Sequence, residues 1–187
     1  MSEQEVAELL VRVCHDLRSP VRAIRAHAEL FLRDGAGVDF AERLGFMIEG
    51  AQQMDRLVDA LSSYALALRI EPSSFQSTAM NVVVRTVLAR LSKELDGARV
   101  TYGDLPRVTG NPDRLMELVE RVIRNASVPH IQVTATEQQG EWLFEVRDDG
   151  AERTFDPLSL AICRVIVERH GGRIWVDPSA VYFTLPA

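Results

Sequence analysis

The sequence predicts an α+β protein, with an N-terminal antiparallel helical hairpin followed by an α/β sandwich. Apolar residues recur every seven positions over roughly the first seventy residues, which is the pattern of paired bundle helices. Beyond them, short strand-like segments alternate with helical ones, which is typical of helices that cover one face of a mixed sheet. We therefore expect two domains, at residues 1–71 and 72–187.

Composition and charge are those of a globular protein. Of the 187 residues, 47% are hydrophobic and 26% charged, so long disorder is not expected. The net charge of −6 argues against nucleic acid and anionic membranes as partners reached through bulk electrostatics. No apolar run approaches the roughly 20 residues that span a bilayer, and no signal-peptide pattern is present. We expect a cytoplasmic protein without membrane insertion, with Cys14 and Cys163 as reduced core thiols.

Two rows of apolar residues predict the first helix of the hairpin. The rows are Leu10, Leu17, Ile24 and Phe31, and Val6 and Val13. The glycines Gly35 and Gly37 interrupt this pattern, and Asp39 with Glu42 forms a capping box that starts the second helix.

The second helix has the same spacing. Its rows are Phe40, Met47, Met54, Leu61 and Leu68, and Leu44, Ala51, Val58 and Ala65. Two helices joined by a short loop lie antiparallel, and one hairpin covers only one side of its apolar seam. We therefore expect a homodimer, in which a second copy completes a four-helix bundle.

The second domain is predicted to contain three helices and six strands, after a linker at residues 71–74. The helices are Met80–Leu95, Pro112–Ala126 and Leu158–Arg169. The strands are Arg99–Tyr102, Arg107–Thr109, His130–Thr136, Trp142–Val146, Arg173–Val176 and Ala180–Leu185. Gly171 and Gly172 end the last helix with a left-handed cap, and Trp175 is expected in the core.

His15 is expected on the helix face opposite the apolar seam. Three-and-four spacing places it in a stripe with Val11, Arg18 and Arg22. A histidine on an exposed helix face is usually no more than a solvated residue. Here Pro20 stands mid-helix, where it removes a backbone hydrogen bond, costs about 3 kcal/mol and kinks the helix. That cost indicates a functional reason.

The chemistry of this stripe fits a phosphoryl carrier. A neutral imidazole is a good nucleophile toward phosphorus near pH 7. The adjacent Asp16 can accept the other ring proton and fix the tautomer. Arg18, Arg22 and Arg25 can balance the charge on the oxygens of a transferring phosphoryl group.

Residues 14–24 resemble the H-box of sensor histidine kinases, whose usual form is histidine, acidic residue, leucine, arginine, serine or threonine, proline. The resemblance implies that His15 is phosphorylated, that Asp16 accepts its proton, and that the partner is a response-regulator receiver domain. Ser19 matches the position whose threonine or asparagine often orients water for phosphatase activity. The segment 62–65 resembles the usual end of the second bundle helix.

The second domain resembles the ATP-binding domain of the same family, a GHKL-like sandwich. The segment 122–126 resembles the N-box, which implies that Asn125 ligates Mg²⁺, although the asparagine usual one turn earlier is Arg121. The segment 148–150 resembles the G1 box, which implies that Asp148 accepts the adenine amino group beside Gly150. The segment 165–174 matches the family's final helix and strand, where His170 is expected to cap the helix end.

The segment after the G1 box departs from the family pattern. The flexible ATP lid is absent, and Pro157 and Ser159 replace the two glycines of the turn that follows it. Glycine lets backbone N–H groups approach triphosphate oxygens, whereas proline has no N–H and serine adds a side chain. We expect a sandwich that keeps its fold but no longer binds the phosphates of a nucleotide, and we expect no cofactor.

Three functions stay open at this point. The first is histidine phosphotransfer through His15 to and from receiver-domain aspartates. The second is an ATP-dependent autokinase that uses ATP and Mg²⁺ through Asn125, Asp148 and Gly150. The third is a non-catalytic pseudokinase scaffold. The intact His15–Asp16 pair favours the first two over the third, and the missing lid favours phosphotransfer over autokinase activity.

Overall fold

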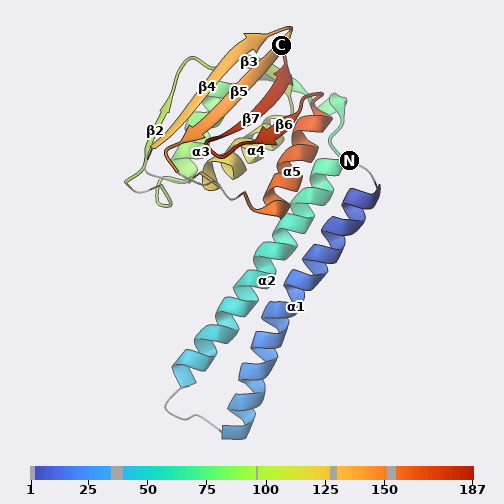
Figure 1. Ribbon diagram of the computed structural model, residues 1–187, viewed down its shortest axis with the longest axis vertical. Helices are drawn as coiled ribbons and strands as arrows, with labels where there is room; N and C mark the ends of the chain where they lie inside the picture. The colour runs from blue at the N-terminus through green and yellow to red at the C-terminus, as the bar shows by residue number, and fades with distance from the viewer. Residues whose placement is uncertain (1–2, 35–39, 96, 127–129, 151–154) are drawn as a thin grey trace. The chain divides into compact units, whose positions relative to one another are not determined.

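The computed structural model describes residues 3–34, 40–95, 97–126, 130–150 and 155–187 (Figure 1). It confirms the predicted class, a helical hairpin followed by an α/β sandwich. Its compact units are Met1–Ser63 and Tyr64–Ala187, and a functional domain boundary after residue 71 stays a prediction. Among the described residues, no helix has the length and apolarity needed to cross a bilayer.

The hairpin consists of α1 (Glu3–Asp34) and α2 (Phe40–Leu68), which run antiparallel (Figure 1). Aromatic contacts fix their register. The rings of Phe31 and Phe40 lie 5.1 Å apart, and His27 stacks on Phe46 at 4.8 Å. The capping-box residue Asp39 and both loop glycines lie outside the described residues.

The two helices approach each other closely beside Pro20, through which α1 continues. A Cβ added at Gly50 would lie 3.3 Å from the carbonyl oxygen of Pro20 and 3.0 Å from Ile24. Both Pro20 and Gly50 are buried. The absence of a side chain at residue 50 therefore permits this close helix packing.

The seam buries some apolar residues of the hairpin and leaves others at the surface. Val13 is only 3% exposed, and Leu17, Ile24, Met47 and Met54 are partly buried. Large apolar side chains remain exposed on both helices: Val11, Val21, Phe40, Leu44, Phe46, Ile48 and Val58. A single hairpin therefore presents more apolar surface than a stable monomer ordinarily does.

The two cysteines differ in environment. Cys163 is buried, and burial raises the pKa of its thiol to about 12, so it is protonated and unreactive. Cys14 is exposed, so the prediction that both are core thiols is wrong for Cys14. The physical reason is helical geometry, because Cys14 lies about 100° around the helix from the buried Val13.

The second unit contains one five-stranded sheet and one two-stranded sheet. The larger sheet has the order β2 (Arg99–Tyr102), β4 (His130–Gln138), β5 (Glu141–Asp148), β7 (Ala180–Pro186), β6 (Ile174–Val176). Only β2 and β4 are parallel neighbours. The smaller sheet pairs β1 (Gln76–Ala79) with β3 (Arg107–Gly110). The chain thus forms the mixed sheet that the sequence predicts.

Three helices cover one face of the larger sheet (Figure 1). They are α3 (Met80–Arg90), α4 (Pro112–Arg124) and α5 (Pro157–Arg169). The core lies between the layers, where Phe144 of β5 stacks on Phe183 of β7 at 4.8 Å and both are 1% exposed. A short 3-10 helix, Pro72–Ser74, occupies the predicted linker.

Three sequence-based expectations for this unit are wrong. The strand β1 is not predicted at all, because its four residues include only one apolar side chain. Helix α3 ends at Arg90 and not at Leu95. The prediction is too long because Leu91 and Leu95 continue the apolar spacing of the helix, although both lie in the turns that follow it. Trp175 is 41% exposed instead of buried, because it lies on the edge strand β6 and stacks on Tyr182.

His170 ends α5 as a buried structural residue, as predicted. Its Nδ1 donates to the carbonyl of Ile166 at 2.6 Å, and its Nε2 accepts the backbone N–H of Asn111 at 2.9 Å. Its ring stacks on Phe75 at 4.6 Å and is 4% exposed. These contacts require a neutral ring that is protonated on Nδ1 alone.

The stability of this unit is expected to depend on pH through His170. Burial lowers the pKa of His170 below its ordinary 6.5, although the hydrogen bond to Ile166 opposes the shift. Below pH 6.5 the unfolded chain therefore takes up a proton more readily than the folded chain. The contribution of His170 to the free energy of unfolding is therefore complete above pH 6.5. This contribution decreases as the pH drops from 6.5 toward the pKa of the folded state.

Urea unfolding at mildly acidic and mildly alkaline pH measures this effect. Trp142 and Trp175 report on this unit alone, because the hairpin unit has no tryptophan. The variant His170→Gln should lose stability at both pH values and show less pH dependence than the wild type. The matched control is His130→Gln, whose ring is 36% exposed. An undiminished pH dependence in His170→Gln would contradict the assignment.

Candidate functional site

His15 is a surface residue of α1. Its side chain is 72% exposed, and its Nδ1 lies 3.3 Å from Oδ1 of Asp16. When Nδ1 carries the proton and donates to this carboxylate, the lone pair is on Nε2. In that tautomer Nε2 is the nucleophilic nitrogen of the pair.

A shallow groove of about 610 Å³ lies beside His15 on α1. Its lining consists of His15, Leu17, Arg18, Val21, Arg22 and Arg25. Arg22 Nε donates to the carbonyl of Arg18 at 3.3 Å, and Arg25 pairs with Glu29 at 3.3 Å. Leu17 and Val21 supply apolar surface between these cations. The groove therefore suits a partner that presents an anionic group surrounded by apolar side chains.

Two of the predicted site residues of α1 lie close to this groove. Arg18 lines it, and Ser19 is exposed on the helix next to it. The structure therefore brings together the hairpin residues that the sequence marks as candidates. Their roles in catalysis stay predictions.

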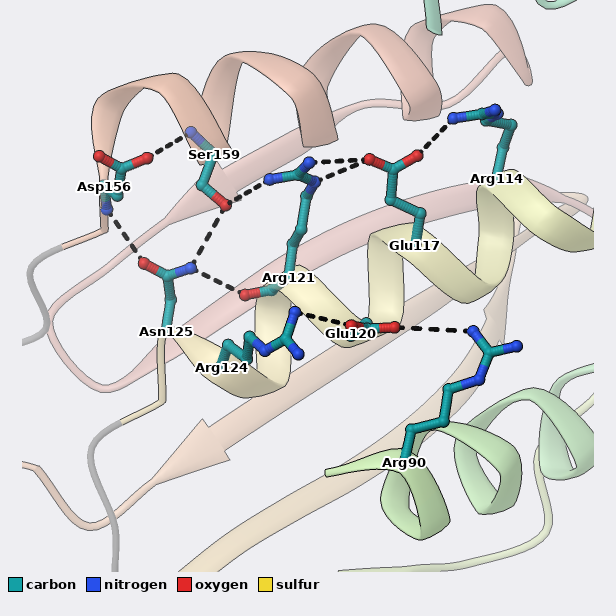
Figure 2. A network of polar contacts seen from close by, with 9 residues as sticks. All are labelled: Arg90, Arg114, Glu117, Glu120, Arg121, Arg124, Asn125, Asp156 and Ser159. Atoms are coloured by element: carbon teal, nitrogen blue, oxygen red, sulfur yellow. Dashed lines mark hydrogen bonds and ion pairs between the residues drawn. The ribbon is translucent and has the colours of Figure 1, made fainter. Parts of the chain in front are cut away.

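Asn125 lies at the C-terminal end of α4, and both ends of its side-chain amide are engaged (Figure 2). Its Nδ2 donates to the carbonyl of Arg121 at 2.8 Å and to Ser159 Oγ at 3.4 Å. Its Oδ1 accepts the backbone N–H of Asp156 at 3.0 Å. The amide oxygen implied as a Mg²⁺ ligand thus already holds the chain segment that leads into α5.

Arg121 lies one turn before Asn125 and reaches toward α5 (Figure 2). Its guanidinium donates to Glu117 at 2.9 Å and to Ser159 Oγ at 3.5 Å. Glu117 also pairs with Arg114 at 2.6 Å, and the side chains of Arg121 and Glu117 are 21% and 19% exposed. A cation of the chain itself therefore occupies the space between the two helices.

Asp148 lies at the end of β5 and is 5% exposed. Its Oδ1 accepts the backbone N–H of Gly150 at 3.0 Å. The chain then reaches Pro157, the first residue of α5, after only eight further residues. Of these, 151–154 lie outside the described residues.

The residues around Asn125 do not fit a magnesium ion. Mg²⁺ requires near-octahedral oxygen ligands, usually including carboxylates. Here the amide oxygen of Asn125 accepts a hydrogen bond, and the nearest turn contributes the cation Arg121, which repels a second cation. Within the described part of the chain, His, Cys, Asp and Glu form no group of three or more that could hold a metal.

Sequence reasoning does not mark Arg114 and Glu117 as part of this network, and it does not predict the contacts of Ser159 with α4. Glu117 lies four positions before Arg121 and three after Arg114, a spacing that predicts ion pairs on one helix face. Ser159 has no comparable signal, because only the fold brings α5 against α4.

A helical hairpin with an exposed histidine–carboxylate pair, followed in the chain by a sandwich of this topology, is the arrangement that the resemblance to two-component signalling proteins implies. The model of the His Kinase A (phospho-acceptor) domain matches residues 5–66. Cyanobacterial phytochrome A of Nostoc sp. is 28% identical over 222 residues, which cover 99% of this chain and 29% of that protein. The chain therefore spans less than a third of the length of this relative.

Solved structures of the same class share the fold. Acinetobacter baumannii histidine kinase AdeS is similar with a TM-score of 0.72 and 17% identity, over 92% of this chain and 97% of that one. Histidine kinase ThkA in complex with response regulator protein TrrA gives a TM-score of 0.74 and 18% identity, over 96% of this chain and 61% of that one. Together with the match to the phospho-acceptor domain, these likenesses support the two-component sensor histidine kinase family for this chain.

Proposed function

We propose that this chain is a histidine phosphotransferase, which accepts a phosphoryl group from one receiver-domain aspartate on His15 and passes it to another. One observation carries the choice of phosphotransfer over autokinase activity. The residues that would hold Mg²⁺ and the phosphates of ATP are bonded to one another, through Asn125, Arg121 and Ser159. The phosphoacceptor pair, in contrast, is intact and exposed.

The transfer step follows from the geometry of His15. The Nε2 lone pair attacks the phosphorus of an aspartyl phosphate, and the P–N bond forms as the P–O bond to the aspartate breaks. The aspartate leaves as a carboxylate. Nδ1 keeps its proton, and Asp16 stabilises the positive charge that develops on the ring. The reverse step on a second receiver aspartate regenerates neutral His15.

The groove beside His15 supports a receiver domain as the partner. Arg18, Arg22 and Arg25 gather positive charge around the phosphoacceptor in a chain whose net charge is −6. Such a patch attracts an acidic surface and steadies a dianionic phosphoryl group during transfer. ThkA, which shares this fold, was solved with the response regulator TrrA. We infer a partner of the same kind here.

A second copy of this chain is proposed to cover the apolar surface of the hairpin. The exposed Leu44, Ile48 and Val58 all belong to α2, away from the groove beside His15 on α1. Burial of apolar area stabilises by about 25 cal/mol per Å², so pairing two such surfaces favours a four-helix bundle. A homodimer leaves the highly exposed face of His15 open to the receiver.

The second candidate is an ATP-dependent autokinase that phosphorylates His15. The likeness in fold to the catalytic domain of histidine kinase ThkA favours it. The resemblance to the N-box and G1 box also implies that Asn125 and Asp148 would serve as its nucleotide-site residues. In that case Asn125 would have to give up its bond to Asp156 before it could face a metal. A pseudokinase scaffold, the third candidate, would have no use for the His15–Asp16 pair.

Phosphate labelling distinguishes these functions. Full-length protein should take up ³²P from receiver domains that were labelled with ³²P-acetyl phosphate, and none from [γ-³²P]ATP with Mg²⁺. Calorimetric titration with MgATP should show no binding at micromolar concentrations. Micromolar ATP affinity or labelling from ATP would establish the autokinase instead. Failure of every receiver domain tested to label the chain would leave the scaffold.

A further inference from the structure

The contacts between α4 and α5 form one continuous polar network (Figure 2). From α4 it includes Arg114, Glu117, Arg121 and Asn125, and from the start of α5 it includes Asp156 and Ser159. Asp156 also caps α5 through the N–H of Ser159 at 2.6 Å. Three of these hydrogen bonds join α4 to the start of α5, namely those from Arg121 and Asn125 to Ser159 and from Asp156 to Asn125.

We propose that Arg121 is a built-in substitute for a bound metal cation, which keeps the nucleotide-like site closed and the sandwich stable without a ligand. This goes beyond the proposed function, because it concerns how the second unit is held together and does not depend on His15. It shares with that function only the inference that nucleotide is not bound. If the guanidinium of Arg121 is removed, the ligand expected to take its place is a divalent cation.

The charges that contact Arg121 support this assignment. The carboxylate of Glu117 pairs with both Arg121 and Arg114, and the three side chains are only 19–23% exposed. A carboxylate that already pairs with two guanidinium groups exerts little net attraction on a further cation. Loss of the charge of Arg121 would remove one of these two cations from a partly buried carboxylate.

The guanidinium also bridges groups from two helices, as a bound metal ion would. A metal joins ligands from separate elements by accepting their lone pairs, whereas Arg121 joins them by donating N–H groups to oxygens. It donates to Glu117 Oε1 on its own helix and to Ser159 Oγ across the gap. The planar fork of arginine can make both bonds at once, which a point charge cannot do as well.

The neighbouring Arg124 provides a matched control. It lies three residues further along α4 and pairs with Glu120 at 2.7 Å and Glu94 at 2.9 Å. Its side chain is 48% exposed, and within the described part of the chain its ion pairs are with Glu94 and Glu120, not with α5, so they contribute little to stability. The two arginines therefore separate a solvent-exposed charge from one that bridges the helices.

The experiment is thermal unfolding of the full chain by tryptophan fluorescence, with and without Mg²⁺ or Mn²⁺ and without nucleotide. The melting temperature of the wild type should not change with either ion. Arg121→Asn removes the cation and introduces an amide oxygen beside Glu117. This variant should melt several degrees lower without metal and recover a clear part of the loss when metal is added. The melting temperature of Arg124→Asn should stay near that of the wild type and should not change when metal is added.

Two further variants test the charge itself in case Arg121→Asn folds poorly. Arg121→Lys keeps a cation and Arg121→Met does not, although the two side chains are similar in length. The melting temperature should fall in the order wild type, Arg121→Lys, Arg121→Met, and metal should not rescue Arg121→Met. Equal stability of the lysine and methionine variants would overturn the proposal. Stabilisation of the wild type by Mg²⁺ alone, or no recovery of Arg121→Asn by either ion, would also overturn it.

Discussion

Replacing His15 with glutamine is expected to reduce phosphoryl uptake from a labelled receiver domain to background. Glutamine preserves a polar side chain of similar reach, but its amide nitrogen is not a nucleophile, so no P–N bond forms. The fold should not change, because the His15 side chain is 72% exposed and its bond to Asp16 is local. The measurement is the fraction of ³²P transferred to the chain, with retention on alkaline and loss on acid treatment as the mark of phosphohistidine.

The control for this prediction is His130→Gln, which alters a histidine of the second unit that also lies beside an aspartate. His130 Nδ1 is 3.7 Å from Asp149, and its Nε2 contacts Thr101 Oγ1 at 3.2 Å. This variant should accept phosphate at the wild-type level. If His15→Gln were labelled as strongly as the wild type, another residue would be the acceptor and the proposed function would be wrong.

The sequence predicted the hairpin well because each apolar position in it reports on one simple geometry. Val13, Leu17 and Ile24 face the seam as the heptad spacing requires, and His15 faces away from it. The prediction for Cys14 is wrong because a single apolar residue beside the seam does not indicate on which face of the helix it lies. The tight approach at Gly50 was not foreseen, since it depends on how α2 passes Pro20.

The second unit was less predictable where its structure depends on contacts between distant segments. Strand β1 exists because β3 supplies an antiparallel partner, not because of a local pattern. Thr78, for example, pairs with Val108, which lies 30 residues later in the chain. Trp175 is large and apolar, yet β6 is a sheet edge, so its outward side chain meets Tyr182 and solvent.

The nucleotide-like site illustrates the same limit. Motif resemblance located Asn125, Asp148 and Gly150 and marked Arg121 as a departure from the pattern. It did not reveal that Arg121 and Asn125 share Ser159 as a partner, because that contact requires α5 to lie against α4. The sequence therefore predicts that nucleotide binding is lost, and the structure adds the contacts between α4 and α5 that support this proposal.

Gly172→Ala is expected to destabilise the second unit by more than about 3 kcal/mol, or to prevent its folding. An added Cβ would lie 1.8 Å from the carbonyl oxygen and 2.7 Å from the carbonyl carbon of Thr184. These are backbone atoms of β7, which pairs with β5 on one side and β6 on the other, so they cannot move aside cheaply. The backbone of Thr184 also donates to the carbonyl of Arg173 at 2.8 Å.

Urea unfolding followed by tryptophan fluorescence measures this loss against two other glycine variants. Gly171→Ala places a side chain at a φ of +83°, in ordinary van der Waals contact with Pro186 at 3.5 Å, so it should cost about 1–2 kcal/mol of backbone strain. Gly103→Ala meets nothing within 4 Å and should be almost neutral. The order Gly172, Gly171, Gly103 separates steric overlap from backbone strain. A Gly172→Ala variant as stable as Gly103→Ala would mean that β7 does not lie against the end of α5 as described.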